Sequence, residues 1–145
     1  MAEPAVTVAF VCVQNAGRSQ MAYAFAEREL EDRNAGDEFE LVMGGTRPGS
    51  HVHPAVVEAM ADVGVDIGDR TPREVTFEEI QGSDYVITMG CSASDVCPAS
   101  WSGENRDWGL DDPDGRSAAE VARVRDEVRD RVVALFDELQ AGEAR

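Results

Sequence analysis

Lysine is absent from this sequence, and basic residues of any kind are few. All 13 basic residues are arginines, whereas 29 residues are acidic, so the formal net charge is −16. Proteins that bind nucleic acid depend on basic contacts with phosphate groups, and a strongly acidic chain offers few of them. We therefore expect no nucleic-acid partner.

Cysteine is scarce, and long apolar runs are missing. The chain has three cysteines, which are too few, and odd in number, for the disulfide framework of a small secreted domain. No apolar run reaches membrane-spanning length, and the N-terminus lacks a signal-peptide pattern. These absences predict a cytoplasmic protein that works without a membrane partner.

Histidine is rare as well, and only His51 and His53 are present. Two histidines without companion ligands do not form a metal site, so we expect no metal. A histidine directly before a helix-starting proline, as His53 precedes Pro54, is typical of a local helix cap rather than of a catalytic residue.

The composition is nevertheless that of a folded protein. Hydrophobic residues make up 43% of the 145 positions, enough for one domain over residues 1–145 and too many for a disordered acidic chain. An acidic surface repels itself unless salt screens the charges. We therefore hypothesise a halophilic protein that works in a salt-rich cytoplasm.

Apolar periodicity predicts strands that alternate with helices along the whole chain. The expected strands are Val6–Cys12, Phe39–Met43, Asp84–Met89 and Asn105–Leu110. The expected helices begin near Arg18, Pro54, Thr76 and Ser117, the last two with capping boxes, and the second ends at Gly64. This alternation predicts an α/β fold with three layers, in which a four-stranded parallel sheet has its first strand in the centre and helices on both faces.

Three stretches that follow predicted strands are expected to converge. They are Cys12, Gly90–Cys91 and Asp111–Asp112. In open parallel sheets, ligands bind beyond the carboxyl ends of the strands. The sequence therefore predicts a ligand site at this edge of the sheet.

The stretch from Cys12 to Ser19 reads Cys-Val-Gln-Asn-Ala-Gly-Arg-Ser and links a predicted strand to a predicted helix. Five residues between Cys12 and Arg18 allow a tight loop whose backbone N–H groups point inward, and a guanidinium offers two parallel donors. Together with the positive end of the helix dipole, these donors suit a tetrahedral oxyanion. The expected substrate-binding residues are Val13, Gln14, Asn15, Ala16, Gly17, Arg18 and Ser19.

Cys12 is the candidate nucleophile of this loop. The thiolate, not the thiol, is the nucleophile, and the positive potential of the loop favours the thiolate. Ser19 can donate its hydroxyl proton to the sulfur. The alternative is that Cys12 is only a small buried apolar residue at the end of a strand.

This loop, the late Asp112-Pro113 pair and the alternation of elements resemble the low-molecular-weight protein tyrosine phosphatase superfamily. Within it, the segments 18–22, 88–98 and 108–113 look like thiol-coupled arsenate reductases, whereas the phosphatases usually have proline where Gln20 stands. The resemblance covers nearly the whole chain. It implies the low-molecular-weight phosphatase fold, with strand order 2-1-3-4.

The resemblance also implies a thiol relay on arsenate, a small oxyanion like phosphate. Cys12 would attack arsenate, Cys91 would attack the adduct and release arsenite, and Cys97 would then take over the disulfide. No cofactor is bound in such a scheme, and an external reductant, thioredoxin or a low-molecular-weight thiol, would complete the cycle. Which thiol performs that last step stays open, because the spacing from Cys91 to Cys97 is one residue shorter than in the best-known thioredoxin-coupled reductases.

The same resemblance implies roles for the residues around Cys12. Arg18 would bind the oxyanion, Asn15 would brace the loop, and Ser19 would stabilise the thiolate. The aspartate before Pro113, Asp112, would be the general acid, with Asp111 as the alternative.

Two other functions and one other reading of the cysteines remain open. A protein tyrosine phosphatase would use Cys12, Arg18 and Asp112, although Asp114-Gly115 stand where aromatic residues could stack on phosphotyrosine. A non-enzymatic oxyanion-binding or redox-sensing module would bind without turnover. The other two cysteines could also be inert packing residues.

A disulfide between Cys91 and Cys97 requires their Cα atoms to lie close together, which restricts the conformation of residues 91–98. In a regular helix the Cα atoms of Cys91 and Cys97 would be about 9 Å apart, which is too far for a disulfide. Ser92, Ser94 and Pro98 are poor helix residues. We therefore predict a mobile loop from Cys91 to Pro98 and a Cys91–Cys97 bond in the oxidised protein.

Overall fold

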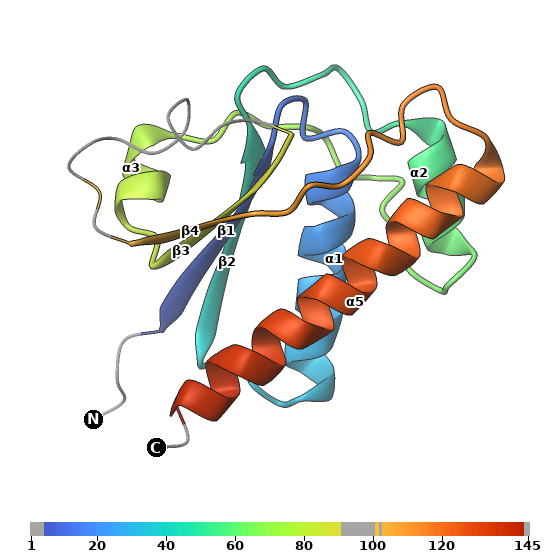
Figure 1. Ribbon diagram of the computed structural model, residues 1–145. Coiled ribbons are helices and arrows are strands. Elements are labelled where there is room, and N and C mark those ends of the chain that lie inside the picture. The colour runs from blue at the N-terminus through green and yellow to red at the C-terminus, as the bar shows by residue number, and fades with distance from the viewer. Residues whose placement is uncertain (1–4, 91–100, 102, 144–145) are drawn as a thin grey trace.

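A computed structural model of the chain describes residues 5–90, 101 and 103–143. Its strands are β1 (Val6–Cys12), β2 (Phe39–Gly45), β3 (Tyr85–Met89) and β4 (Glu104–Asp107). Its helices are α1 (Arg18–Asp32), α2 (Pro54–Ala61), α3 (Phe77–Gln81) and α5 (Ala118–Glu143). The strands form one sheet in the order β2-β1-β3-β4, and every pairing is parallel (Figure 1). The predicted α/β fold and strand order are confirmed.

The central strand β1 is apolar on both of its faces because helices cover both faces of the sheet. Val8 and Phe10 belong to the larger core, which α1, α2 and α5 complete. Ala9 and Val11 point to the other face, where Ile80 of α3 packs against them. Figure 1 shows α3 on one side of the sheet and α1 and α5 on the other. The continuous apolar run of the sequence therefore reflects a strand that is buried twice.

Helix α5 packs an apolar stripe against the sheet and its neighbouring helices. Its buried residues lie at helical spacing on one face, namely Val121, Val124, Val128, Val132, Leu135, Phe136 and Leu139. The opposite face carries most of its charged residues. None of the helices in the described part of the chain is both long and apolar enough to span a bilayer.

Both predicted capping boxes are present. The Thr76 hydroxyl accepts a hydrogen bond from the Glu79 backbone N–H (3.1 Å), and the Glu79 carboxylate accepts one from the Thr76 N–H (2.9 Å). Ser117 and Glu120 make the same reciprocal pair at 3.2 and 3.4 Å. These local bonds fix where α3 and α5 begin.

Several element boundaries differ by one to three residues from those expected from the sequence: β2 extends to Gly45 rather than Met43, β3 begins at Tyr85 rather than Asp84, and β4 begins at Glu104 rather than Asn105. Helix α2 ends at Ala61 rather than at Gly64, which follows in a turn with φ +80°. Strand β4 ends at Asp107, although the apolar pattern extends to Leu110. A tight turn in which the Leu110 N–H bonds to the Trp108 carbonyl (2.8 Å) takes the chain out of the sheet. Both side chains are buried, and the Trp108 N–H still donates to the Thr88 carbonyl of β3 (2.9 Å), so apolar character alone could not mark the end of the strand.

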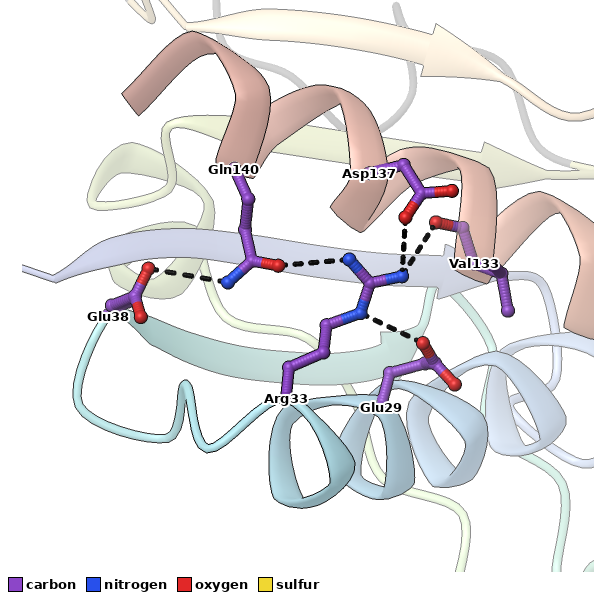
Figure 2. A network of polar contacts seen from close by, with 6 residues as sticks. All are labelled: Glu29, Arg33, Glu38, Val133, Asp137 and Gln140. Carbon is purple, nitrogen blue, oxygen red and sulfur yellow. Dashed lines mark hydrogen bonds and ion pairs between the residues drawn. The ribbon is translucent and has the colours of Figure 1, made fainter. Parts of the chain in front are cut away.

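Arg33 joins the C-terminal end of α1 to α5. Its guanidinium donates to the Glu29 and Asp137 carboxylates (2.9 and 2.8 Å), the Gln140 side-chain oxygen (2.9 Å) and the Val133 carbonyl (3.3 Å) (Figure 2). Burial lowers the pKa of Arg33, but the hydrogen bonds to the two carboxylates outweigh it and raise that pKa overall. This network holds α1, whose other end begins at the Cys12–Ser19 loop.

Candidate functional site

One pocket lies where the strands end, and the Cys12–Ser19 segment, hereafter the oxyanion loop, forms most of it. The pocket has a volume of about 220 Å³. Its lining residues are Cys12, Val13, Gln14, Ala16, Gly17, Arg18, His53, Gly90 and Asp112. The residues that follow β1, β3 and β4 in the sequence thus contribute to one site, as the parallel order of the strands requires.

Cys12 lies at the carboxyl end of β1, and the residue is only 3% exposed. The Asn15 backbone N–H donates to it (3.1 Å), and the Ser19 hydroxyl oxygen is 2.8 Å away. Because that oxygen already accepts a bond from the Asn15 side-chain amide (2.7 Å), its own proton is available for the sulfur. Two hydrogen-bond donors are therefore directed at the Cys12 sulfur.

Asn15 is the residue that shapes the oxyanion loop. It is fully buried and has φ +52°, a left-handed conformation that asparagine tolerates better than most residues. Its side-chain oxygen accepts bonds from the Arg73 backbone N–H (3.0 Å) and from the Gln20 amide (3.2 Å), which also donates to the Asn15 carbonyl (3.0 Å). Asn15 is therefore held from two sides, and it in turn orients Ser19.

Arg73 links the oxyanion loop to α3 and β2, a role that the sequence analysis missed. Its guanidinium donates to the Met43 carbonyl (2.7 Å) and to Glu79 (3.1 Å), while its backbone N–H holds Asn15. Partial burial alone would raise the pKa of Glu79, but hydrogen bonds from Thr76 and Arg73 outweigh it and lower that pKa. No local pattern marks Arg73, since its partners lie more than 25 residues away or six residues ahead.

Arg18 is held against the pocket wall by its neighbours. One guanidinium nitrogen donates to the Leu110 carbonyl (3.1 Å), and another lies 3.7 Å from the Asp112 carboxylate. A Cβ atom at Gly90 would lie 2.6 Å from the guanidinium, so only glycine allows this close approach. The side chain is 12% exposed, and its position in the pocket suits two-point binding of an oxyanion.

The structure distinguishes Asp112 from Asp111. Asp112 lines the pocket, and its carboxylate accepts the Asp114 N–H (3.0 Å) and faces Arg18. Asp111 does not line the pocket and instead lies 3.7 Å from Arg123 of α5. The carboxylate that can reach a bound oxyanion is therefore that of Asp112.

His53 occupies the N-cap position of α2, as predicted, but it caps the helix with its backbone carbonyl and its side chain makes no capping hydrogen bond. Its ring lines the pocket, with Nδ1 3.9 Å from the Asp114 carboxylate, and its backbone N–H donates to the Ala16 carbonyl (2.9 Å). Nothing in the local sequence predicts this placement, because it depends on how the segment before α2 packs on the oxyanion loop.

Cys91, Cys97 and the predicted mobile loop from 91 to 98 lie outside the described residues. Cys91 follows Gly90 in the sequence, and Gly90 lines the pocket. Within residues 5–90, 101 and 103–143, no three side chains of histidine, cysteine, aspartate or glutamate gather as a metal-binding group.

Comparison with known proteins gives concordant matches. The family model of the low molecular weight phosphotyrosine protein phosphatases matches residues 7–145. A Halobacterium salinarum protein, provisionally named an arsenate reductase, is 53% identical over 129 residues, which are 89% of each chain. An arsenate reductase of Bacillus cereus is 35% identical over 127 residues, 87% of this chain and 90% of that protein.

Solved structures show the same fold. A thioredoxin-dependent arsenate reductase of Corynebacterium glutamicum matches 98% of this chain with a TM-score of 0.77 and 37% identity, and this chain spans 65% of that one. An arsenate reductase in a phosphate-binding state matches 92% of this chain and 98% of its own, with a TM-score of 0.76 and 31% identity. A Vibrio cholerae low molecular weight phosphotyrosine phosphatase, 20% identical, matches 93% of this chain and 97% of its own with a TM-score of 0.78, which is a likeness of fold alone.

Proposed function

Because this chain belongs to the low molecular weight phosphotyrosine protein phosphatase family, we propose that it uses the fold of that family to reduce arsenate to arsenite. The observation that carries the proposal is the pocket in which two donors face the Cys12 sulfur beside Arg18 and Asp112. Relatives of 35% identity or more that bear the name arsenate reductase support the choice of reaction.

Substrate binding and the first chemical step use the described pocket. The backbone N–H groups of the oxyanion loop and the Arg18 guanidinium bind arsenate, which is tetrahedral and negatively charged like phosphate. The Cys12 thiolate attacks arsenic, so that a sulfur–arsenic bond forms and an arsenic–oxygen bond breaks. Asp112 donates a proton to the departing oxygen, which leaves as water.

The second step carries the redox change. The Cys91 thiolate attacks the Cys12 sulfur, a disulfide forms, and the electron pair of the sulfur–arsenic bond passes to arsenic. Arsenic(V) becomes arsenic(III) and leaves as arsenite, while two thiols are oxidised. Cys97 then attacks Cys91 and frees Cys12, and an external dithiol such as thioredoxin, or a low-molecular-weight thiol, reduces the Cys91–Cys97 bond. The thioredoxin-dependent relative supports an external thiol reductant.

Hydrolysis of a phosphate monoester is the second candidate activity. The same Cys12, Arg18 and Asp112 would form a phospho-cysteine that water cleaves, and the family match favours this chemistry. Pro113 is followed by Asp114-Gly115 and not by aromatic residues that could stack on a phosphotyrosine ring. We therefore expect any phosphatase activity to be a side activity.

The test compares the wild type with Cys91→Ser and Cys12→Ser. Arsenite and phosphate release are measured with excess thioredoxin and thioredoxin reductase, from arsenate and from p-nitrophenyl phosphate. A reductase loses multiple-turnover arsenite release in Cys91→Ser and every activity in Cys12→Ser. Phosphate release without arsenite release, unchanged in Cys91→Ser, would assign the phosphatase, and oxyanion binding without turnover would assign a binding module.

We further propose that the enzyme works as one domain, residues 1–145, in a salt-rich cytoplasm. The net charge of −16 and the complete absence of lysine support the second part. The match of the family model to residues 7–145 supports the first.

A further inference from the structure

The segment that carries Asp112 has no regular secondary structure between β4 and α5, so its position depends on contacts with its surroundings. The Asp112 carboxylate lies in the pocket and accepts a hydrogen bond from the Asp114 N–H (3.0 Å). This bond makes the two residues one local unit. A group that holds Asp114 therefore also sets where the Asp112 carboxylate lies.

Two rings contact the oxyanion loop at Gly17: that of Pro113, which belongs to this segment, and that of His53, which precedes α2. A Cβ atom at Gly17 would lie 3.0 Å from Pro113 Cγ and 3.4 Å from His53 Cδ2, so both rings rest against the glycine backbone. The other side of the His53 ring places Nδ1 3.9 Å from the Asp114 carboxylate. The His53 backbone is itself fixed, because its N–H donates to the Ala16 carbonyl (2.9 Å). The ring thus lies between the oxyanion loop and the segment that carries the acid.

We propose that His53 is a positioning residue for the reaction and that it acts on Asp112 through Asp114. A proton on Nδ1 allows the ring to donate to the Asp114 carboxylate, and this bond draws the Asp112 segment toward a bound oxyanion. The inference rests on the proposed function, since it concerns the acid of that reaction.

The surroundings of His53 fit this role. The ionisable groups around its ring are Asp114 and Asp112 from the segment after β4, and Arg18 and Cys12 from the oxyanion loop. Arg18 lies 3.7 Å from the Asp112 carboxylate, so an oxyanion bound by Arg18 would compete with that carboxylate for the guanidinium. The His53–Asp114 contact and the packing of Pro113 on Gly17 do not involve Arg18 and can hold the segment in place.

The variants separate this role from a structural one. His53→Gln loses the donor at the Nδ1 position, whereas His53→Asn retains an N–H close to it. His51→Gln is the matched control, because His51 is exposed, contacts Ser50 and does not line the pocket. We expect kcat for arsenate to fall about fivefold in His53→Gln, the upper range for a weak charge pair, with KM changed less than twofold. His53→Asn and His51→Gln should stay within twofold of the wild type.

The same substitution in the Asp112→Asn protein tests whether His53 acts on the reaction through Asp112. In Asp112→Asn, adding His53→Gln should have no further effect on kcat, because the acid that it positions is absent. An equal fivefold loss in that background, or a loss that appears in KM alone, would overturn the inference. So would a loss in His53→Asn as large as in His53→Gln.

Failure of the proposed function can be told apart from failure of this inference. If the wild type makes no arsenite, the proposed function falls, and the inference is tested with inorganic phosphate and amide hydrogen exchange at residues 112–116. Phosphate should slow that exchange in the wild type and His53→Asn but not in His53→Gln. The same response in all three proteins, or none in the wild type, would overturn the inference.

Discussion

The chemistry of this protein depends on how firmly the groups around the Cys12 sulfur are held. The Asn15 side-chain amide donates to the Ser19 hydroxyl oxygen, so the hydroxyl proton is directed at the sulfur. Asn15 is fixed by Arg73 and Gln20, neither of which reaches the pocket. These donors are in place before substrate binds, so binding does not have to reorganise the loop.

The two adjacent aspartates should differ strongly in their effect on catalysis. Asp112→Asn removes the pocket carboxylate, and we expect kcat for arsenate to fall about 100-fold or more, the usual contribution of a general acid. Asp111→Asn is the matched control, because that carboxylate faces Arg123 outside the pocket, and its kcat should stay within about twofold of the wild type. Steady-state arsenite release measures both, and equal losses in the two variants would show that Asp112 is not the acid.

At the scale of elements, the junction of α1 and α5 should contribute measurably to stability. Arg33→Met removes four hydrogen bonds from a side chain that is 19% exposed, and we expect the free energy of unfolding to fall by about 1–2 kcal/mol. Arg131→Met is the control, because Arg131 makes only an exposed pair with Glu127, which is worth about 0.5 kcal/mol or less. Urea unfolding measures both variants, and similar losses would mean that the Arg33 network adds nothing beyond a surface pair.

The Glu79 carboxylate, which is bonded in the capping box of α3 and to Arg73, should make stability depend on pH. The pKa of Glu79 is lowered in the folded protein, so its contribution is present above its unfolded pKa and is lost as pH falls through the folded value. Glu79→Gln should therefore cost about 1 kcal/mol at pH 7 and less once the pH has fallen below the folded pKa, where the wild-type carboxyl is also neutral. Urea unfolding at pH 7 and at a series of lower pH values is the measurement.

Glu78→Gln provides the control for this prediction. Glu78 lies in the same turn of α3, but its side chain is exposed and is not the capping residue. We expect a loss of only a few tenths of a kcal/mol, from the helix dipole alone. A larger pH dependence in Glu78→Gln than in Glu79→Gln would contradict the assignment of the effect to the capping box.

At the scale of the whole molecule, the excess of negative charge should make stability rise with salt. Screening relieves self-repulsion at a net charge of −16, and we expect Tm to increase by about 5 °C or more between 0.1 M and 2 M potassium chloride. A triple variant, Glu31→Gln, Asp37→Asn and Glu40→Gln, removes three exposed charges and should show a smaller increase. A Tm that falls with salt, or an equal rise in both proteins, would contradict a halophilic surface.

The sequence by itself determined the elements and their order. The run from Val8 to Val11 is apolar throughout because β1 is buried on both faces, and such a run is visible without a structure. The capping boxes at Thr76 and Ser117 are equally local, since the bonded residues lie three apart. The Cys12–Ser19 loop is local as well, because the spacing from its cysteine to its arginine, and its glycine, all fall within eight residues.

Only the tertiary structure decided which side chains complete the pocket. Asp111 and Asp112 are chemically identical neighbours, and they differ because the chain that leaves the Trp108–Leu110 turn directs Asp112 toward Arg18 and Asp111 toward α5. His53 follows the pattern of a helix cap, yet packing against Gly17 places its ring in the pocket. These positions depend on contacts between segments that lie tens of residues apart in the sequence. Sequence periodicity shows which face of a segment is buried, but it does not show which other segment packs there or how that segment is oriented.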